Sequence, residues 1–221
     1  MSSVESRGSR AAAPRRRADK RQAILDAAFL VFARRGYAQA CVQEVAEEAG
    51  VAKPTVYNHL DDKETLFRYA VEASADVLLA ELLATIDDLR DRAAEQDPRA
   101  ALTDLAVGLA RICCGERAVA LRRLTYAESP HFADLADAVQ ERTARRPLAA
   151  LADRLARLAL SGRLRPCDPE QAAGHFFALL TGPLELLSRL GARPVPAAEL
   201  RSTAEGAVDV FLRAYGDAPG E

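Results

Sequence analysis

The sequence predicts an all-α protein of about nine helices, and three observations lead to this fold class. Alanine contributes 46 of the 221 residues, and alanine has the highest intrinsic helix propensity. β-branched and aromatic residues are sparse, and no run of them alternates with polar residues as a half-buried strand would. Hydrophobic residues make up 49% of the chain, which is enough to bury a core as one or two domains.

The first predicted helix follows a segment without apolar periodicity. Residues 1–18 mix Ser, Gly, Arg and Pro, so we expect a flexible basic arm there. From Asp19 to Arg35 apolar residues recur at helical spacing, and Gly36 supplies a C-cap that ends the helix. The apolar positions are Ile24, Ala28, Val31 and Phe32.

Three further helices are predicted between Val42 and Arg92. A short helix covers 42–49 and ends at Gly50, and a third helix covers 53–60 with Pro54 in its first turn, where the missing N–H is harmless. Asp61 and Glu64 have the spacing of a capping box, so we expect them to begin a long fourth helix that runs to about Arg92.

The helical pattern resumes after Asp97-Pro98 and predicts roughly five more helices. Helix-breaking signals interrupt it at 114–115, 129–130, around Pro147, at 161–162, 168–169 and 191–196. The last two helices are expected at about 169–190 and 197–214. We therefore divide the chain into an arm (1–18), an N-terminal domain (19–69) and a helical C-terminal domain (70–221).

The composition also excludes several classes of protein. No apolar run reaches the ~18 to 20 residues of a membrane span, and no apolar stretch of a secretory signal follows the basic N-terminal residues. Four cysteines without zinc-like spacing are expected to stay reduced, so we expect a cytoplasmic protein without metal or cofactor. Because the 27 Arg far outnumber the 3 Lys, GC-rich coding DNA and a bacterial source are indicated.

Charge is distributed unevenly along the chain. Residues 1–69 hold 12 basic and 9 acidic residues, whereas residues 70–221 hold 18 and 23. The first 35 residues alone hold 9 basic and 3 acidic residues. This asymmetry favours a polyanion partner for the N-terminal end, although a solvated terminus would have the same composition.

Two short helices joined by a glycine-containing turn, after a stabilising helix, are typical of a helix-turn-helix whose second helix enters the DNA major groove. At 100° per residue, Val56 and Leu60 fall on one side of that helix and anchor it inward. Lys53 and Tyr57 lie at the border of the opposite, polar side, which carries Pro54, Thr55, Asn58 and His59.

These residues resemble the TetR family of bacterial transcriptional regulators over about 19–69. The resemblance is carried by Ile24–Ala28, Phe32, Arg35–Tyr37, Val45–Ala46, Ala49–Val51, Lys53–His59 and Lys63–Phe67. It implies a DNA-binding domain joined to a C-terminal domain that dimerises and binds a small molecule. The expected protein is a one-component repressor that binds a palindromic operator as a homodimer and is released by a small-molecule inducer.

The resemblance also implies individual contacts with double-stranded operator DNA. The family's base contacts fall on Gln43, Lys53, Pro54 and Tyr57, and its phosphate contacts on Thr55, Asn58, His59 and Lys63. Lys63 also lies at the positive N-terminal end of the fourth helix, where a cation and backbone N–H groups suit a phosphate oxygen. Cys41 and Ala52 replace residues that often carry hydroxyls, so a phosphate contact and a cap on the recognition helix are expected to be missing.

The C-terminal half is similar to AefR-type members, in segments 121–128, 162–165, 168–169 and 174–182 and at Phe132. The resemblance implies that the last two helices form a four-helix bundle with their mates, which small residues such as Ala172, Ala173, Gly174 and Ala178 permit. Candidate residues for the inducer pocket are Cys113, Tyr126, Phe132, Phe176 and Phe177, although aromatic residues at this spacing equally suit a core. Cys113 and Cys114 are either buried free thiols or an oxidant sensor.

Two other function classes remain open at this point. An enzyme would need a nucleophile with a base, a carboxylate pair or a phosphate-binding glycine loop, and we find none. A non-specific DNA-packaging protein is disfavoured by the net charge of −2. His131 and His175 have no second ligand at helical spacing, so a metal site is not expected. Operator preference separates a regulator from a packaging protein, and substrate turnover would indicate an enzyme.

Overall fold

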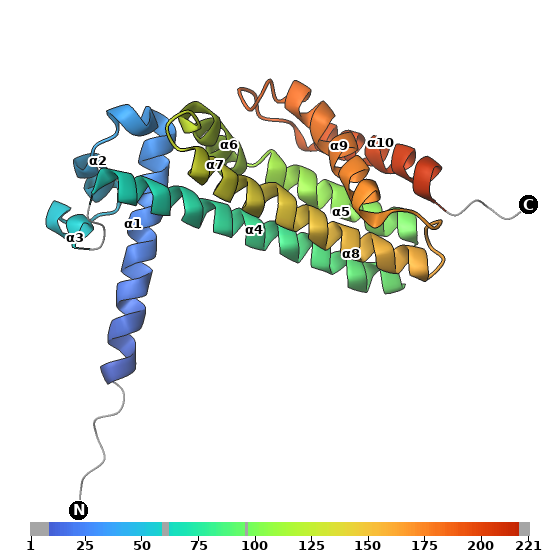
Figure 1. Cartoon of the computed structure of the whole chain (residues 1–221), viewed down its shortest axis with the longest axis horizontal. Coiled ribbons are helices and arrows are strands. Elements are labelled where there is room, and N and C mark those ends of the chain that lie inside the picture. Colours follow the sequence, from blue (N-terminus) through green and yellow to red (C-terminus); the bar gives the residue numbers. More distant parts are fainter. Residues whose placement is uncertain (1–8, 59–61, 96, 217–221) are drawn as a thin grey trace, which may run out of the picture. The chain divides into compact units, whose positions relative to one another are not determined.

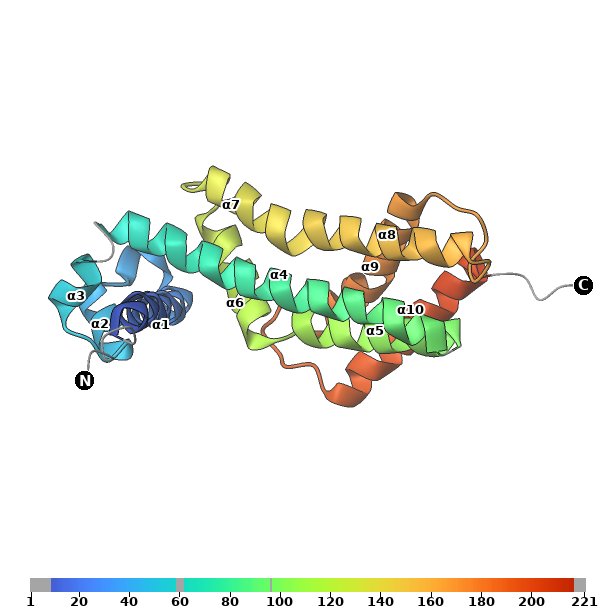
Figure 2. The same cartoon turned by 90° about the horizontal axis from the view of Figure 1, so that it is seen from below.

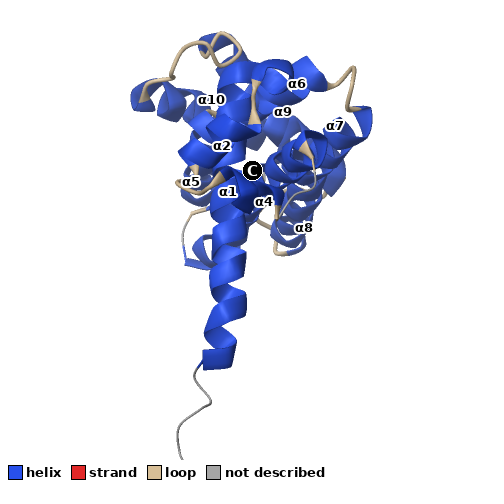
Figure 3. Cartoon of the chain, turned by 90° about the vertical axis from the view of Figure 1, so that its left-hand side faces the viewer, coloured by secondary structure: helices blue, strands red, loops and turns tan. Residues whose placement is uncertain are grey.

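The computed structural model describes residues 9–58, 62–95 and 97–216. Apart from one isolated bridge between Leu164 and Gly216, its regular elements are helices (Figure 3). They are α1 (Ser9–Gln39), α2 (Val42–Glu48), α3 (Lys53–Tyr57), α4 (Lys63–Glu95), α5 (Pro98–Cys113), α6 (Glu116–Glu128), α7 (Ala133–Gln140), the π-helical segment η1 (Glu141–Arg145), α8 (Arg146–Leu160), α9 (Pro169–Leu187) and α10 (Ala197–Tyr215).

The predicted all-α fold is confirmed. Because α7, η1 and α8 follow one another without a break, the described residues form nine helical stretches if α1 is counted once, and about nine were expected from the sequence. None of the described helices combines the length and the apolar character that crossing a membrane requires.

The chain divides into two compact units, Met1–Ser74 and Ala75–Glu221, so the division falls inside α4 rather than after residue 69. In the first unit α1, α2, α3 and the start of α4 enclose a small core (Figure 1). The Phe32 and Phe67 rings meet edge to face with centroids 5.0 Å apart, and Tyr37 lies 5.0 Å from Phe67. These aromatic contacts join α1 to α4 within this unit.

The second unit has a larger core contributed by the C-terminal part of α4 and by α5, α8, α9 and α10. α8 runs beside α4 (Figures 1 and 2), and α10 packs against α5 and α9. At the centre of this core Phe176 of α9 meets Phe211 of α10 edge to face at 5.1 Å, and both are buried. Ala172 and Ala173 are also fully buried within their own chain.

Helix α1 begins ten residues earlier than predicted, at Ser9 instead of Asp19. The prediction failed because it relied on apolar periodicity, which residues 9–18 lack. Their Ala and Arg residues nevertheless have high intrinsic helix propensity. The predicted stop at Gly36 is present as a residue with φ of 74° and ψ of 166°, which interrupts the helical backbone before Gln39.

The predicted break near Pro147 was also wrong, because helix continues through it. A π turn, Glu141–Arg145, precedes Pro147, which lies in the first turn of α8. π turns are commonly found as single insertions within α-helices, and a proline in a first turn leaves no helical hydrogen bond unmade. Pro183 likewise lies inside α9 without ending it.

The chain leaves α9 through three consecutive residues with left-handed backbone, Arg189 (φ 50°), Leu190 (φ 57°) and Gly191 (φ 85°). The Leu190 N–H donates to the Glu185 carbonyl at 2.9 Å, which closes the turn. A Cβ at Gly191 would overlap with Cγ1 of Val119 in α6. Glycine is therefore required at 191 by both the backbone and the close approach of α6.

Candidate nucleic-acid interface

α2 and α3 form the predicted helix-turn-helix, and their bounds match the sequence prediction to within a few residues. Gly50 has φ of +64° and ends α2, as a left-handed C-cap glycine does. The Val51 N–H donates to the Ala46 carbonyl at 2.9 Å, so the turn is closed by the backbone alone. α3 then begins at Lys53 with Pro54 in its first turn.

The two sides of α3 differ sharply in burial. Val56 is buried in the core of the unit, whereas the Tyr57 ring is 45% exposed. Lys53, Pro54 and Asn58 are also exposed, and Thr55 is half-buried. α3 therefore presents a short surface that combines one cation, two ring-shaped side chains and an amide. His59 and Leu60 lie outside the described residues.

Two neighbouring positions explain how α2 and α3 begin. Ala52 is the N-cap of α3 and its methyl group offers no hydrogen bond to the helix, so the side-chain cap is missing, as expected. Cys41 precedes α2, and its backbone N–H donates to the carboxylate of Glu44 at 3.3 Å. A side chain three residues into α2 thus satisfies the N–H group at this helix start.

Asp62 caps the long fourth helix, and Asp61, which the sequence analysis paired with Glu64, lies outside the described residues. Asp62 accepts a 2.6 Å hydrogen bond from the Thr65 backbone N–H. That bond, a second one from the Thr65 side chain and a backbone bond from Glu64 lower the pKa of the Asp62 carboxyl. A carboxylate in this place also interacts favourably with the positive end of the helix.

Two candidate contact residues already have partners within the chain. The Gln43 amide donates to the Glu47 carboxylate at 2.8 Å. Lys63 donates to the Ala38 carbonyl at 3.0 Å and lies 4.9 Å from the centroid of the Tyr37 ring. Lys63 thereby joins the start of α4 to the last residues of α1, beyond Gly36.

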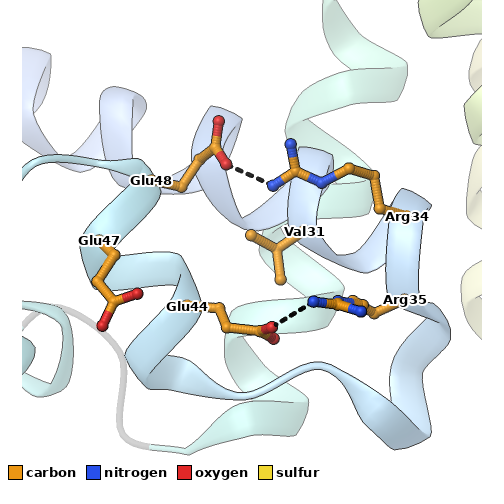
Figure 4. Close-up of a pocket in the computed structure, with 6 residues that line it drawn as sticks. All are labelled: Val31, Arg34, Arg35, Glu44, Glu47 and Glu48. Atoms are coloured by element: carbon orange, nitrogen blue, oxygen red, sulfur yellow. Dashed lines mark hydrogen bonds and ion pairs between the residues drawn. The ribbon is translucent and has the colours of Figure 1, made fainter.

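A groove of mixed charge lies between α1 and α2 (Figure 4). Two ion pairs, drawn as dashed lines in Figure 4, cross the groove. Arg34 pairs with Glu48, and Arg35 pairs with Glu44 at 3.1 Å. Val31 lies at its base, and Glu47 completes the lining. The groove accordingly pairs its two cations internally, a role that the sequence analysis did not assign to these residues.

One of the five candidate pocket residues, Cys113, lines a small cavity. This cavity lies between α6 and the ends of α5 and α9, and the other four candidates do not line it. Phe176 belongs to the core, Phe132 is buried at the start of α7, Phe177 packs at the edge of the core, and Tyr126 is 72% exposed. The remaining lining residues are Cys114, Arg122, Thr181, Leu184, Glu185 and Ser188.

That cavity offers only about 10 Å³ to the centre of a water molecule, roughly the room that one water requires. Burial raises the pKa of the Cys113 thiol to about 11 and also raises that of Cys114. Thiols are nucleophiles only as thiolates. Among the described residues, therefore, this pair is better suited to packing than to sensing oxidants.

The described part of the chain contains no group of three or more side chains suited to a metal ion. His175 shares a 2.6 Å hydrogen bond with the Tyr215 hydroxyl. This contact joins α9 to α10, and it gives His175 a structural partner that lies far away in the sequence.

Comparison with known proteins agrees with this architecture. Residues 24–70 match a family described as bacterial regulatory proteins of the tetR family, and residues 100–217 match the C-terminal domain of AefR-like transcriptional repressors. A TetR-family transcriptional regulator from Mesorhizobium loti MAFF303099 is 31% identical. The similarity covers 91% of this chain and 98% of that one, with a TM-score of 0.82.

Two further relatives are more distant or match a shorter part. The flavonoid-responsive regulator FrrA is 25% identical, with a TM-score of 0.63 over 90% of this chain and 98% of that one. The HTH-type transcriptional activator FasR of Mycolicibacterium smegmatis is 37% identical over 79 residues, 34% of this chain and 36% of FasR. The chain thus spans about a third of the length of this curated relative.

These relatives are transcriptional regulators and not enzymes, which confirms the expectation that the chain regulates transcription. The matched segments cover both units, and the first one contains the complete helix-turn-helix. The protein therefore belongs to the TetR family of DNA-binding transcriptional regulators, with an AefR-like C-terminal domain.

Proposed function

We propose that this protein is a repressor that binds a palindromic operator as a homodimer and leaves it when a small-molecule inducer binds. The observation that carries the proposal is the surface of α3, where Lys53, Pro54 and Tyr57 are exposed beside the buried anchor Val56. A short helix with this division between exposed and buried sides suits insertion into the major groove.

The exposed side chains of α3 suit direct recognition of bases. The Lys53 ammonium donates to guanine O6 or N7, and the rings of Pro54 and Tyr57 pack against thymine methyl groups. Gln43 of α2 is a fourth candidate base contact, and its amide must then leave or share its present bond with Glu47. Guanine and thymine are accordingly expected in each half-site.

The proposed phosphate contacts surround this surface. Thr55 and Asn58 supply a hydroxyl and an amide, and Lys63 supplies an ammonium at the start of α4. His59 is proposed from the sequence alone. Because Lys63 is held by Ala38 and Tyr37, it positions α4 and contributes its charge to a phosphate nearby.

Dimerisation through α9 and α10 is supported by two glycines in these helices that no contact within the chain requires. Gly182 of α9 and Gly206 of α10 are exposed, and a Cβ at either position would meet nothing within 4 Å. Glycine inside a helix costs roughly 1 kcal/mol relative to alanine. A second copy that packs closely against both helices would explain the absence of side chains there.

The neighbours of these glycines fit the same interpretation. One face of α9 carries Ala178, Gly182 and Leu186, spaced four residues apart, and Leu186 is 82% exposed. One face of α10 carries Ser202, Gly206 and Val210 with the same spacing. An apolar side chain beside two small residues on each helix suits a self-complementary interface.

Repression rather than activation is favoured by the longer of the two matched segments. Residues 100–217 resemble the C-terminal domain of AefR-like repressors, whereas FasR, named as an activator, matches only a third of the chain. An inducer would act by binding more tightly to the conformation of the dimer that does not fit the operator. FrrA, named as flavonoid-responsive, gives one class of compound to test.

Fluorescence anisotropy with duplexes that flank the protein's own gene tests the proposal, with unlabelled random duplex as competitor. We expect saturable binding that survives the competitor. Tyr57→Ala is expected to abolish this preference, while Leu30→Ala, whose side chain is similarly exposed on the same unit at 48%, is expected to retain it. Equal affinity for all duplexes would instead support the non-specific DNA-binding alternative.

The dimer is tested separately by sedimentation of two single variants. Gly182→Leu and Gly206→Leu should shift the protein from dimer to monomer, because leucine would separate closely packed helices. Ala149→Leu, at an exposed position of α8, is the matched control and should leave the dimer intact.

A reporter gene placed behind the bound duplex then distinguishes repression from activation by the sign of its response.

A further inference from the structure

The cavity between α6 and the ends of α5 and α9 is lined by an arginine whose charge has no partner in the described part of the chain. Arg122 of α6 is half-buried there, and its guanidinium makes no hydrogen bond or ion pair with another described residue. Arg142 and Arg154, two other half-buried arginines of the same unit, each pair with an aspartate of α4 at 2.7 Å. Because partial burial of an unpaired cation is unfavourable, the N–H groups of Arg122 are suited to an acceptor from outside the chain.

The α9 side of the same cavity carries hydrogen-bond acceptors. The Thr181 hydroxyl donates to the Phe177 carbonyl at 2.8 Å, and the Ser188 hydroxyl donates to the Glu185 carbonyl at 3.2 Å. A hydroxyl has a single proton, so both oxygens can only accept further hydrogen bonds. The Glu185 carboxylate also lines the cavity, and no described residue pairs with it. The α6 side of the cavity therefore donates hydrogen bonds, whereas the α9 side accepts them.

The size and the charge of the cavity limit what it admits. Its enclosed part has room for about one water, and the empty space between its side chains, counted out to open solvent, is about 220 Å³. Pockets for drug-sized ligands measure roughly 300 to 1,000 Å³, so a small molecule or one polar head group suits this site. Arg122 and Glu185 contribute opposite charges, and the thiols of Cys113 and Cys114 are neutral because burial raises the pKa of both.

We propose that this cavity binds the α-amino acid group of a small zwitterionic ligand, with the ligand carboxylate on Arg122 and the ligand ammonium on α9. A guanidinium donates two parallel hydrogen bonds to a carboxylate. Glu185 supplies the charge opposite to the ammonium, and Thr181 and Ser188 supply hydroxyl oxygens. A ligand with a carboxylate alone would leave Glu185 unpaired, and an amine alone would leave Arg122 unpaired. This inference rests on the proposed function, since it names the chemical class of the inducer.

Thermal unfolding of the full chain without DNA tests the site. The probes are the twenty standard amino acids, added one at a time, together with propionate and propylamine, which carry one charge each. At least one amino acid should raise the Tm in a concentration-dependent manner, because a ligand that binds only the folded state stabilises it. Propionate and propylamine should leave the Tm unchanged. No rise with any amino acid would overturn the proposal, as would an equal rise with propionate.

Variants assign the two charges of the ligand to the two sides of the cavity. Arg122→Gln and Glu185→Gln should each raise the Kd of the stabilising amino acid at least about tenfold in calorimetric titration, and Arg122→Lys, which keeps the charge, should raise it less. Arg123→Gln on α6 and Glu81→Gln on α4 remove the same charges at exposed positions outside the cavity. Both controls should bind as the wild type does. An unchanged Kd in Arg122→Gln, or an equal loss in Arg123→Gln, would overturn the proposal.

Anisotropy with the operator duplex separates this inference from the proposed function. The stabilising amino acid should release the wild-type protein from the operator, while Arg122→Gln should remain bound at the same concentration. Stabilisation by an amino acid without release of the operator would support the binding site and contradict the inducer mechanism proposed above. Specific operator binding by a protein that no amino acid stabilises would support operator recognition and overturn the site.

Discussion

The Nε atom of Arg142, in the π segment η1, donates to the Asp76 carboxylate of α4 across 2.7 Å. A second nitrogen of the same guanidinium donates to the Ala138 carbonyl at 3.0 Å. Further along, Arg154 of α8 donates to Asp87 of α4, also across 2.7 Å. Two ion pairs therefore join α4 to the continuous helix α7–η1–α8 within the second unit.

The π turn accounts for the spacing of these two pairs. Asp76 and Asp87 are separated by eleven positions, or about three α-helical turns, which places them on one face of α4. Arg142 and Arg154 are separated by twelve positions, which in an uninterrupted α-helix would turn them apart by more than 100°. A π turn takes up one extra residue, so both arginines reach the same neighbouring helix.

The Arg142–Asp76 pair should contribute a small, measurable coupling to stability. Asp76 is exposed and Arg142 is partly buried, so a double-mutant cycle of Arg142→Gln and Asp76→Asn in urea unfolding should give about 0.2 to 1 kcal/mol. The Arg201–Glu205 pair at 3.9 Å is the control, with coupling close to zero. Equal coupling energies for the two pairs would contradict a specific role for the Arg142–Asp76 ion pair between η1 and α4.

The cap at the start of α4 should make stability depend on pH in the acid range. The pKa of Asp62 is lowered below 3.8 because the carboxylate accepts hydrogen bonds from Thr65. Its stabilising effect is therefore complete above pH 3.8 and is lost as the pH falls through the lower, folded-state pKa.

Thermal unfolding of Asp62 variants checks this assignment. Asp62→Ala should lower the Tm at neutral pH more than Asp62→Asn, whose amide oxygen also caps a helix. The difference in Tm between wild type and Asp62→Asn should shrink as the pH falls below 3.8. A difference that stays constant across this range would show that the Asp62 charge has no part in the cap.

The cysteines should differ strongly in reactivity. Cys41 is exposed, whereas burial raises the pKa of Cys113 to about 11, so alkylation by iodoacetamide near pH 7.5 should modify Cys41 and spare Cys113. Mass spectrometry of the labelled protein measures this, and the same protein in guanidinium should label at all four positions. In a Cys41→Ser background, peroxide should leave DNA affinity unchanged. A loss of affinity there would restore the thiol-sensor hypothesis.

Replacing Phe67 by alanine should strongly destabilise the DNA-binding unit. Its ring is buried and contacts Phe32 and Tyr37, so Phe67→Ala should cost about 3 to 5 kcal/mol of unfolding free energy. Leu30→Ala, at an exposed position of the same unit, should change it by no more than about 0.5 kcal/mol. Urea unfolding followed by circular dichroism measures both, and a loss below about 1 kcal/mol for Phe67→Ala would contradict the packing described above.

Features that depend on local chemistry were predictable from the sequence. Gly50 ends α2 because its backbone is left-handed, and Pro54 suits the first turn of α3, so both boundaries could be identified from single residues. Val56 could be assigned to the interior from helical periodicity. The exposed residues of α3 followed from the same periodicity.

Features that depend on contacts between distant segments were not predictable in the same way. Lys63 carries no sequence signal for its bond to Ala38, and Arg142 carries none for its bond to Asp76, since each partner comes from another helix. The sequence left the pocket residues undecided for the same reason: whether Phe176 lines a cavity or fills the core depends on the position of Phe211. The first ten residues of α1 were missed because they are helical through intrinsic propensity. The prediction relied on apolar periodicity, which these residues do not show.

The contact between Gly191 and Val119 has an evolutionary consequence. A side chain at position 191 would overlap with the Val119 side chain. The two positions are therefore expected to vary together among homologous sequences, although they lie far apart in the chain. Asparagine is the other residue that adopts left-handed backbone readily, and it fits at 191 only after Val119 has become smaller. Val119→Ala is thus the permissive first step and Gly191→Asn the second, and the opposite order passes through an intermediate that the fold does not accommodate.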